Sequence, residues 1–374
     1  MKIGILTHPL DYNYGCLLQN FALQTVLKRM GHETITINRY SAPPTFLLLL
    51  KNWTIRLLLR VVKDEKVSLK WNPYLDIETK DILASKTQQF VDRNIVSTER
   101  VFPKDLKKID QKYRFDAYVV GSDQVWLPHF CLNAFLDFVD RDNVKRVFYA
   151  ASSGKVSFAN DPHLSKQCKT LAKKFSGISV REDTLLPISH NYLGIDAIQV
   201  LDPTLLLDPN DYLTACSEIV DASPVVFTYI LDKTPIKEKI VERVSNDMQL
   251  PIVRGSVEED YEKGKSMDIT KCIYPSVDSW IQNIARSEFV VTDSFHGTCL
   301  SIVFRKPFVV VGNMERGIER FKSLLKLFNL QSRLITDCSE LNESFYSQLE
   351  NDEITTKINE LRDKSLSFLQ YNLR

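Results

Sequence analysis

Short apolar runs alternate with helix-length segments along most of the chain, and most of these runs end in a polar cluster. The run 289–291, for example, ends in Thr292-Asp293-Ser294, and a helix-length gap separates it from the next run. Runs of this length are typical of buried strands. The pattern predicts strands at 3–6, 118–120, 147–149, 178–180, 198–201, 225–231, 251–253, 289–291 and 308–311, and helices at 17–30, 161–175, 235–248 and 276–285. This alternation favours parallel sheets with helices on both faces.

A cluster of proline, aspartate and asparagine at 205–211 predicts the seam between two Rossmann-like halves. We expect the first domain to cover residues 1–212, with an insertion at about 42–110, and the second to cover residues 213–345. Residues 346–374 include a segment with helical periodicity and no following strand, so we expect a helix that packs back on the first domain. The polar strand ends of both halves would then face a central cleft.

The window 288–311 carries the most information, because it predicts a strand, a polar turn, a helix and a second strand in succession. His296 stands where the first strand gives way to the helix. In open parallel sheets, ligands bind outside the carboxyl ends of the strands, where helix N-termini offer unpaired N–H groups. His296 is therefore a candidate ligand-binding residue.

Composition narrows the class of protein. The 374 residues are 44% apolar and 25% charged, and the net charge of +1 gives no global field that would attract nucleic acid. The seven cysteines are scattered without a CxxC pair, which argues against a disulfide framework or a zinc site. The N-terminus runs directly into a predicted strand without a signal-peptide pattern, so we expect a cytoplasmic protein.

Residues 46–63 depart from the α/β pattern. Helical spacing gathers Asn52, Arg56, Arg60 and Lys63 on a narrow polar side opposite a wide apolar side. One interpretation is an insertion helix packed on the domain with its basic residues in water. The other is a helix that lies at the inner face of the cell membrane with its basic side among anionic headgroups.

Six motifs follow one another as they do in the polysaccharide pyruvyl transferase family, and the chain resembles this family over about residues 2–334. The motifs lie at 13–24, 116–126, 149–154, 179–183, 200–205 and 293–298. The resemblance implies two Rossmann-like domains in the GT-B-like arrangement, with both parallel sheets facing a central cleft. It also implies transfer of a pyruvyl group from phosphoenolpyruvate onto two sugar hydroxyls as a ketal, in cell-surface polysaccharide biosynthesis. The acceptor would be a sugar or a lipid-linked oligosaccharide, with phosphoenolpyruvate as co-substrate and no further cofactor or metal.

Such a reaction requires an anion clamp and a group that titrates near neutral pH. Histidine is the side chain that titrates near neutral pH, so His296 is the candidate for the titrating group. Arg181 has the planar fork that suits a carboxylate or phosphate. The resemblance implies that both are catalytic and bind the donor. Ser294, Gly297 and Thr298 flank the histidine and would add hydroxyl or backbone contacts to an oxyanion.

Alternative roles exist for both residues. His296 would serve only structure if it bonded a neighbouring carbonyl, and Arg181 would do so if it paired with Glu182 or Asp183. Members of the family usually carry an arginine two residues before the histidine, where this chain has Ser294. The candidates to replace that cation are Arg254, Lys306, Arg316 and Arg320, and we expect Arg316 and Arg320 to bind the donor.

The acceptor side is predicted from polar residues at the other strand ends. The turn 13–15 opens onto a helix, its glycine permits close approach, and Asp123 with Gln124 suits sugar hydroxyls. Trp126 would stack on a sugar face or lie in the core. The candidate acceptor-binding residues are His8, Asn13, Tyr14, Gly15, Gln19, Asp123, Gln124 and Trp126.

Two other functions remain open at this point. One is a GT-B glycosyltransferase that uses a nucleotide sugar, and the other is a non-catalytic sugar-binding member of the polysaccharide assembly machinery. No constellation typical of a metal site appears in the sequence, since Asp293 alone does not make one.

Overall fold

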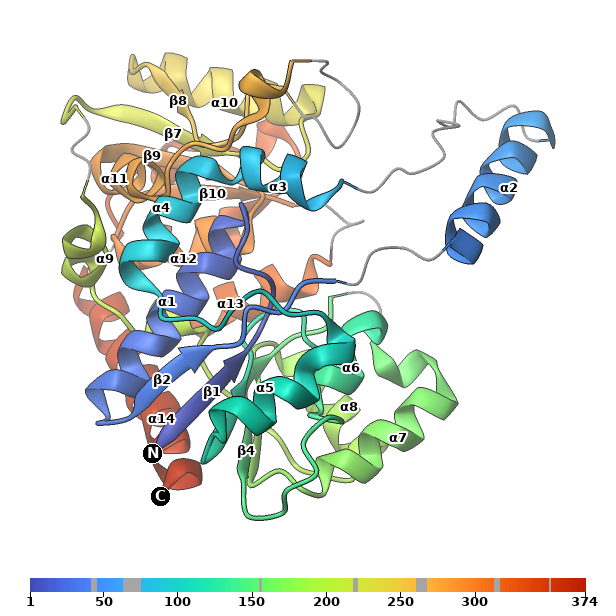
Figure 1. Cartoon of the computed structure of the whole chain (residues 1–374). Coiled ribbons are helices and arrows are strands. Elements are labelled where there is room, and N and C mark those ends of the chain that lie inside the picture. Colours follow the sequence, from blue (N-terminus) through green and yellow to red (C-terminus); the bar gives the residue numbers. More distant parts are fainter. Residues whose placement is uncertain are drawn as a thin grey trace.

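The computed structural model describes residues 1–41, 46–62, 75–154, 157–217, 221–259, 268–312, 317–349 and 351–374. Within these ranges the chain forms two parallel sheets, each flanked by helices (Figure 1). Every strand that the apolar runs predict is present, with boundaries that differ by a few residues. The α/β class with two Rossmann-like sheets is therefore confirmed.

The first sheet has the strand order β2-β1-β3-β4-β5-β6, and all its pairings are parallel. Its strands are β1 (Lys2–Leu6), β2 (Glu33–Thr36), β3 (Ala117–Val120), β4 (Lys145–Ala151), β5 (Gly177–Val180) and β6 (Ile198–Gln199). The helices of this half are α1 (Tyr14–Arg29), α3 (Ile77–Leu83), α4 (Ser85–Asn94), α5 (Leu106–Tyr113), α6 (Pro128–Ala134), α7 (Pro162–Ala172), α8 (Leu186–Ile188) and α9 (Pro209–Ala215).

The second sheet has the order β11-β10-β9-β7-β8 and is also parallel. Its strands are β7 (Val225–Tyr229), β8 (Ile252–Arg254), β9 (Ser287–Thr292), β10 (Phe308–Val311) and β11 (Leu334–Ile335). Its helices are α10 (Pro235–Met248), α11 (Val277–Arg286), α12 (Phe295–Val303) and α13 (Glu319–Leu327). The unit β9-α12-β10 confirms the βαβ prediction for the window around His296.

Helix α1 connects the two halves. Asn13 caps its N-terminus, since the Asn13 Oδ1 accepts hydrogen bonds from the backbone N–H of Gly15 (3.0 Å) and Cys16 (3.3 Å). Most residues of α1, including Gln19 and Gln24, are buried, and the helix contacts both β2 and α12. One apolar cluster therefore runs through both halves and joins side chains such as Ile3, Leu17, Phe227, Trp280 and Ile302.

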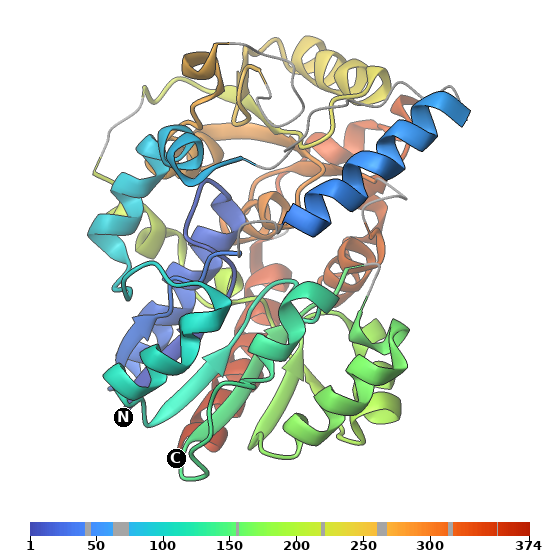
Figure 2. The ribbon, with the colours of Figure 1, turned by 45° about the vertical axis from the view of Figure 1, so that its right-hand side comes forward.

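The last helix, α14 (Asn351–Leu373), runs back along the first half, so both termini lie at the same end of the molecule (Figure 2). Ile358 and Leu369 are fully buried on it. The Oγ of Ser365 accepts a hydrogen bond from the backbone N–H of Leu201 (3.0 Å), and the Arg362 Nη1 donates to Asp208 Oδ1 (2.6 Å). These contacts hold α14 against the segment that follows β6.

Helix α2 (Phe46–Val62) stands apart from both sheets in Figure 1. Its described apolar side chains include Phe46 and Leu58, which are 67% and 60% exposed. The side chains of Asn52, Arg56 and Arg60, and the whole of Lys63, lie outside the described residues. Within the described ranges, α2 and the other helices are too short or too polar to cross a membrane.

Candidate active site

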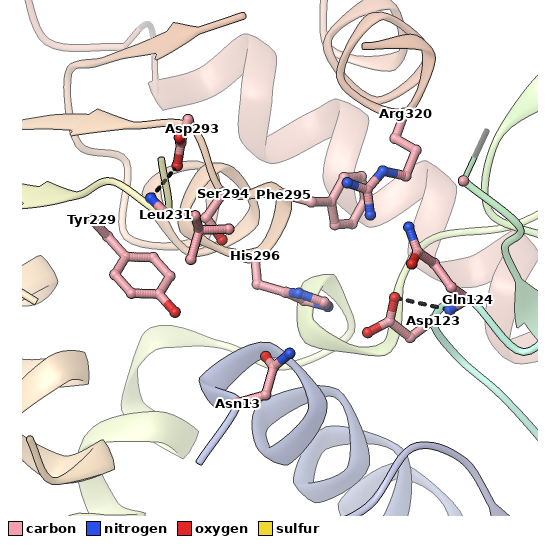
Figure 3. Close-up of a pocket in the computed structure, with 11 residues that line it drawn as sticks. Asn13, Asp123, Gln124, Tyr229, Leu231, Asp293, Ser294, Phe295, His296 and Arg320 are labelled. Atoms are coloured by element: carbon pink, nitrogen blue, oxygen red, sulfur yellow. Dashed lines mark hydrogen bonds between the residues drawn. The ribbon is translucent and has the colours of Figure 1, made fainter. Parts of the chain in front are cut away.

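The carboxyl ends of strands from both sheets surround a pocket of about 360 Å³ (Figure 3). The first half contributes the start of α1 and the turns after β3 and β4. The second half contributes the end of β7, the turn between β9 and α12, and the start of α13. The lining residues are Asn13, Asp123, Gln124, Gly154, Tyr229, Leu231, Asp293, Ser294, Phe295, His296 and Arg320.

His296 belongs to the second half but is held by the first. Its Nδ1 lies so close to Gly15 that a Cβ on that residue would be 2.1 Å away. Its Nε2 lies 3.6 Å from the Asp202 Oδ2 and forms no hydrogen bond with another described residue. Gly15 thus lets the His296 ring approach the backbone of α1 closely. From the sequence, a sugar was expected to approach at this glycine.

Arg181 lies behind the pocket wall, with its side chain only 2% exposed. Its Nη1 donates to the Asp202 Oδ2 (2.9 Å), and its Nη2 lies 3.4 Å from the Asp123 Oδ1. Its Nε is 3.6 Å from the Glu182 Oε2, and the guanidinium carbon lies 4.1 Å from the centre of the Phe295 ring. A direct contact between Arg181 and a donor is therefore not supported, because the arginine already pairs with three carboxylates.

Asp202 is the centre of this buried network. Its Oδ2 also accepts a hydrogen bond from the Ser122 Oγ (2.9 Å), and its Oδ1 accepts from the backbone N–H of Thr204 (3.0 Å). Burial would raise the pKa of Asp202, but His296 and Arg181 outweigh it and hold the pKa well below its usual range. Asp202 therefore keeps a negative charge beside the imidazole.

The pKa values of Asp123 and Arg181 are also set by the competition between burial and neighbouring charges. Burial would raise the pKa of Asp123, but Arg181, His8 and His296 lower it below the usual value. For Arg181, burial would lower the pKa, yet the neighbouring carboxylates raise it above the usual value. Asp123, Asp202 and Arg181 consequently stay ionised throughout the physiological pH range.

The turn before α12 is built by its own side chains. Ser294 is the N-cap, and its Oγ accepts a hydrogen bond from the Gly297 N–H (3.3 Å). The Thr298 Oγ1 donates to the Ser294 carbonyl (3.0 Å) and is fully buried. A Cβ on Gly297 would lie 2.5 Å from the Thr292 Oγ1. Gly297 and Thr298 therefore shape the turn, whereas Ser294 and His296 also line the pocket.

Asp293 anchors the second half of the pocket. It accepts hydrogen bonds from the backbone N–H groups of Leu231 (2.6 Å) and Asp232 (3.1 Å), and from the Lys237 Nζ (2.6 Å). The lysine and the aspartate are both buried. This buried ion pair fixes the loop between β7 and α10, and Lys237 was not anticipated from the sequence.

Four basic residues were candidates for a donor-binding cation, and among those in the described ranges Arg320 lines the pocket. It lines the pocket from α13, and its guanidinium carbon lies 6.0 Å from the centre of the Phe295 ring. Arg254 pairs with Glu238 (2.8 Å), and Lys306 follows the opposite end of α12. Arg316 lies outside the described residues. Of these candidates, Arg320 is the one that the described part of the chain places at the pocket.

Three of the predicted acceptor-side residues, Asn13, Asp123 and Gln124, line the pocket. Tyr14 and Gln19 do not, because α1 is buried on nearly all sides. The Tyr14 hydroxyl donates to the Pro275 carbonyl (2.8 Å) and its ring stacks on Trp280. The Gln19 Nε2 donates to the Thr7 Oγ1 (2.8 Å). Both side chains make their contacts within the fold and lie outside the pocket lining, so their sugar contacts stay predictions.

His8 and Trp126 are also turned inward. The His8 ring stacks on Phe130 at 5.2 Å, and burial lowers its pKa. Trp126 is fully buried among Phe135, Phe148 and Phe158. Neither side chain lines the pocket, and the packing of Trp126 matches the core interpretation of that residue.

Sequence reasoning missed several residues of the site. Tyr229, Leu231 and Gly154 line the pocket, and Asp202 is the centre of the buried network. Each lies near the end of a predicted strand or in the polar cluster after it, so the rule that ligands collect at strand ends would have identified them as candidates.

The family assignment follows from the sequence of the same region. The pattern of the polysaccharide pyruvyl transferase family matches residues 13–315, which include all the described lining residues except Arg320. The chain belongs to the polysaccharide pyruvyl transferase family. A comparison of the chain with individual curated proteins found no match.

Solved structures place this pyruvyl transferase family member in the GT-B fold. S. aureus MnaA, in a structure with UDP, is 11% identical with a TM-score of 0.52, and the alignment covers 100% of this chain and 96% of that one. A Listeria monocytogenes protein assigned as a UDP-N-acetylglucosamine 2-epimerase is also 11% identical, with a TM-score of 0.51 and the same coverage. At this identity the likeness shows the fold alone.

We predict that Gly15→Ala will destabilise the protein by about 1–3 kcal/mol, because the new methyl group must displace the His296 ring. The cost should fall sharply in a His296→Ala background, where the ring is gone. Urea unfolding of the two single variants and the double variant measures this coupling. Additive costs would show that the glycine and the histidine do not contact each other.

We predict that Asp202→Asn will destabilise the protein at pH 7 by about 3 kcal/mol, because it leaves Arg181 buried with weaker pairing. The folded pKa of Asp202 is lowered, so its contribution is complete above the unfolded value of about 4 and is lost as pH falls further. Denaturation at several pH values checks this. Asp142→Asn, at an exposed carboxylate, is the control and should change stability little. A cost for Asp202→Asn that does not shrink in acid would contradict the account.

Proposed function

We propose that this protein transfers a pyruvyl group from phosphoenolpyruvate onto a pair of sugar hydroxyls as a cyclic ketal, in cell-surface polysaccharide biosynthesis. The observation that carries the proposal is the meeting of His296, Arg320 and the α12 N-terminus in one pocket. Phosphoenolpyruvate carries a carboxylate and a phosphate, so its site needs cations and N–H donors. These three features supply both.

Binding of the donor is assigned to the second half. The guanidinium of Arg320 offers a planar fork that bonds a carboxylate or a phosphate. The first turn of α12 adds backbone N–H groups and the positive end of the helix dipole. The other half presents Asp123 as an ionised carboxylate, which repels the donor and keeps it on the α12 side.

His296 is proposed as the proton donor to the methylene carbon of phosphoenolpyruvate. Protonation of that carbon leaves a cationic C2, which the first sugar hydroxyl attacks with loss of its proton. The phosphate then leaves with the C–O bonding pair, and the second hydroxyl closes the ring and releases its proton. One hydroxyl proton restores His296 and the other leaves with phosphate. Asp202 is proposed to orient the imidazole, because its Oδ2 lies 3.6 Å from the His296 Nε2.

Asp123 and Gln124 are proposed to orient the attacking hydroxyls. Both line the pocket on the side opposite α12 (Figure 3). The lowered pKa of Asp123 makes it a weak base, so it would accept a hydrogen bond from a hydroxyl without taking its proton. The first half thus serves the acceptor and the second half serves the donor.

The acceptor is proposed to reach the site at a membrane surface, as a lipid-linked oligosaccharide. Exposed apolar side chains of α2, such as Phe46 and Leu58, and four cations without an acid in residues 46–63 suit an anionic bilayer. The enzyme is proposed to act there on the cytoplasmic side of the membrane. In the alternative interpretation, α2 packs on the domain, and those apolar side chains would then be buried.

We predict that phosphoenolpyruvate will raise the melting temperature of the wild-type protein and that Arg320→Gln will weaken its binding about 10- to 100-fold, because a charge-assisted hydrogen bond is lost. Thermal-shift titration measures both. Arg254→Gln is the matched control, since that arginine pairs with Glu238 outside the pocket. His296→Ala should abolish phosphate release while the fold persists.

Two results would contradict the proposal. Stabilisation by a nucleotide sugar but not by phosphoenolpyruvate would favour the glycosyltransferase alternative. Equal effects of Arg320→Gln and Arg254→Gln would place the donor elsewhere.

We predict that the protein will sediment with vesicles that contain phosphatidylglycerol, and that changing Arg56, Arg60 and Lys63 together to Glu will release it. Changing Lys166, Lys169 and Lys173 to Glu gives the matched control, because these exposed lysines, two in α7 and one at its C-cap, carry the same total charge. Equal release by both triple variants, or no sedimentation at all, would contradict a specific role for α2.

A further inference from the structure

A second pocket, of about 470 Å³, adjoins the first, and Gly154 and Arg320 line both. Its other lining residues are Ser153, Ser157, Ala159, Asn160, Glu182, Thr184, Leu185, Ile188, Tyr192, Gly317 and Glu319. We propose that this second pocket holds a neutral sugar unit of the acceptor, next to the sugar that receives the pyruvyl group. The inference rests on the proposed function and extends it, because it assigns an acceptor subsite and a substrate class.

The polar side of the second pocket includes a buried acceptor. Glu182 is only 3% exposed, and its Oε1 accepts a hydrogen bond from the Ser152 Oγ (2.6 Å). Among the described residues none donates a hydrogen bond to its Oε2, which lies 3.6 Å from the Arg181 Nε. Buried acceptors are normally satisfied. The ion pair with Arg181 leaves this oxygen without a hydrogen bond, which a sugar hydroxyl that reached the carboxylate would supply.

The pocket also has an apolar lining. Leu185, Ile188 and Tyr192 come from the segment after β5, where a π-helical turn spans Ser189–Leu193. Tyr192 is 42% exposed, so its ring is accessible at the pocket. Sugar rings combine hydroxyl edges with apolar C–H faces, and a tyrosine ring combines an apolar body with a polar tip. The pocket offers both kinds of surface.

Charge selects a neutral ligand. Glu182 and Glu319 are carboxylates of this pocket, whereas Arg320 lies where it meets the first one. A phosphate or a uronic acid would meet two like charges, while hydroxyl groups would find acceptors. Arg320 therefore separates an anion site in the first pocket from a hydroxyl site in the second. The sugar that reacts would lie between them, at Gly154.

The test is the binding of the full-length protein to an array of neutral and acidic oligosaccharides, followed by titration with the strongest neutral binder. Tyr192→Ala should weaken binding of that oligosaccharide about tenfold, and Tyr192→Phe should restore most of it. Phosphoenolpyruvate binding should be unchanged in both variants. Tyr371→Ala is the control, because that tyrosine is 76% exposed on α14, outside both pockets.

The outcomes separate the two proposals. Loss of oligosaccharide binding in Tyr192→Ala with normal phosphoenolpyruvate binding supports the subsite. If phosphoenolpyruvate binds but no neutral oligosaccharide does, or if Tyr192→Ala and Tyr371→Ala bind equally well, the subsite is refuted and the proposed function stands. If the wild-type protein does not bind phosphoenolpyruvate, the proposed function is refuted, and the subsite proposal that rests on it is refuted with it.

Discussion

The site depends on one buried ionic contact, the pairing of Arg181 with Asp202, Asp123 and Glu182. A guanidinium buried this deeply is stable only because carboxylates surround it, and the pKa values of Asp123 and Asp202 are lowered in return. The network joins the ends of β3 and β5 to the segment after β6. It leaves the charge of Asp202 beside His296, so the histidine of the second half is positioned by the first.

This arrangement divides the work between the two halves. The second half carries His296, Arg320 and the α12 N-terminus, which suit the carboxylate and phosphate of the proposed donor, and the first half carries ionised or amide oxygens, which suit hydroxyl groups. A ketal-forming reaction needs both surfaces within reach of one carbon atom. Helix α1 makes this geometry rigid, because it is buried between the halves and Gly15 lets the imidazole approach its backbone.

The sequence predicts the fold better than the site. Apolar runs indicate buried strands wherever they occur, so both sheets and the β9-α12-β10 unit follow from local pattern. The side-chain directions do not, because they depend on contacts between distant segments. Gln19 and Trp126 resemble binding residues in the sequence, yet the packing around α1 and α6 buries them. Gly15 meets His296 across 281 positions of chain, and no local pattern encodes that contact. Arg320 was a candidate only because a cation was missing at Ser294.

The most direct test of the account is a crystal structure of the protein with phosphoenolpyruvate bound. The account predicts that the donor's anionic groups contact Arg320 and the first turn of α12, with the His296 imidazole close to the methylene carbon. Arg181 should remain paired with Asp202. A donor bound directly to Arg181, with its carboxylate partners displaced, would contradict the separation of a buried positioning network from the substrate pocket.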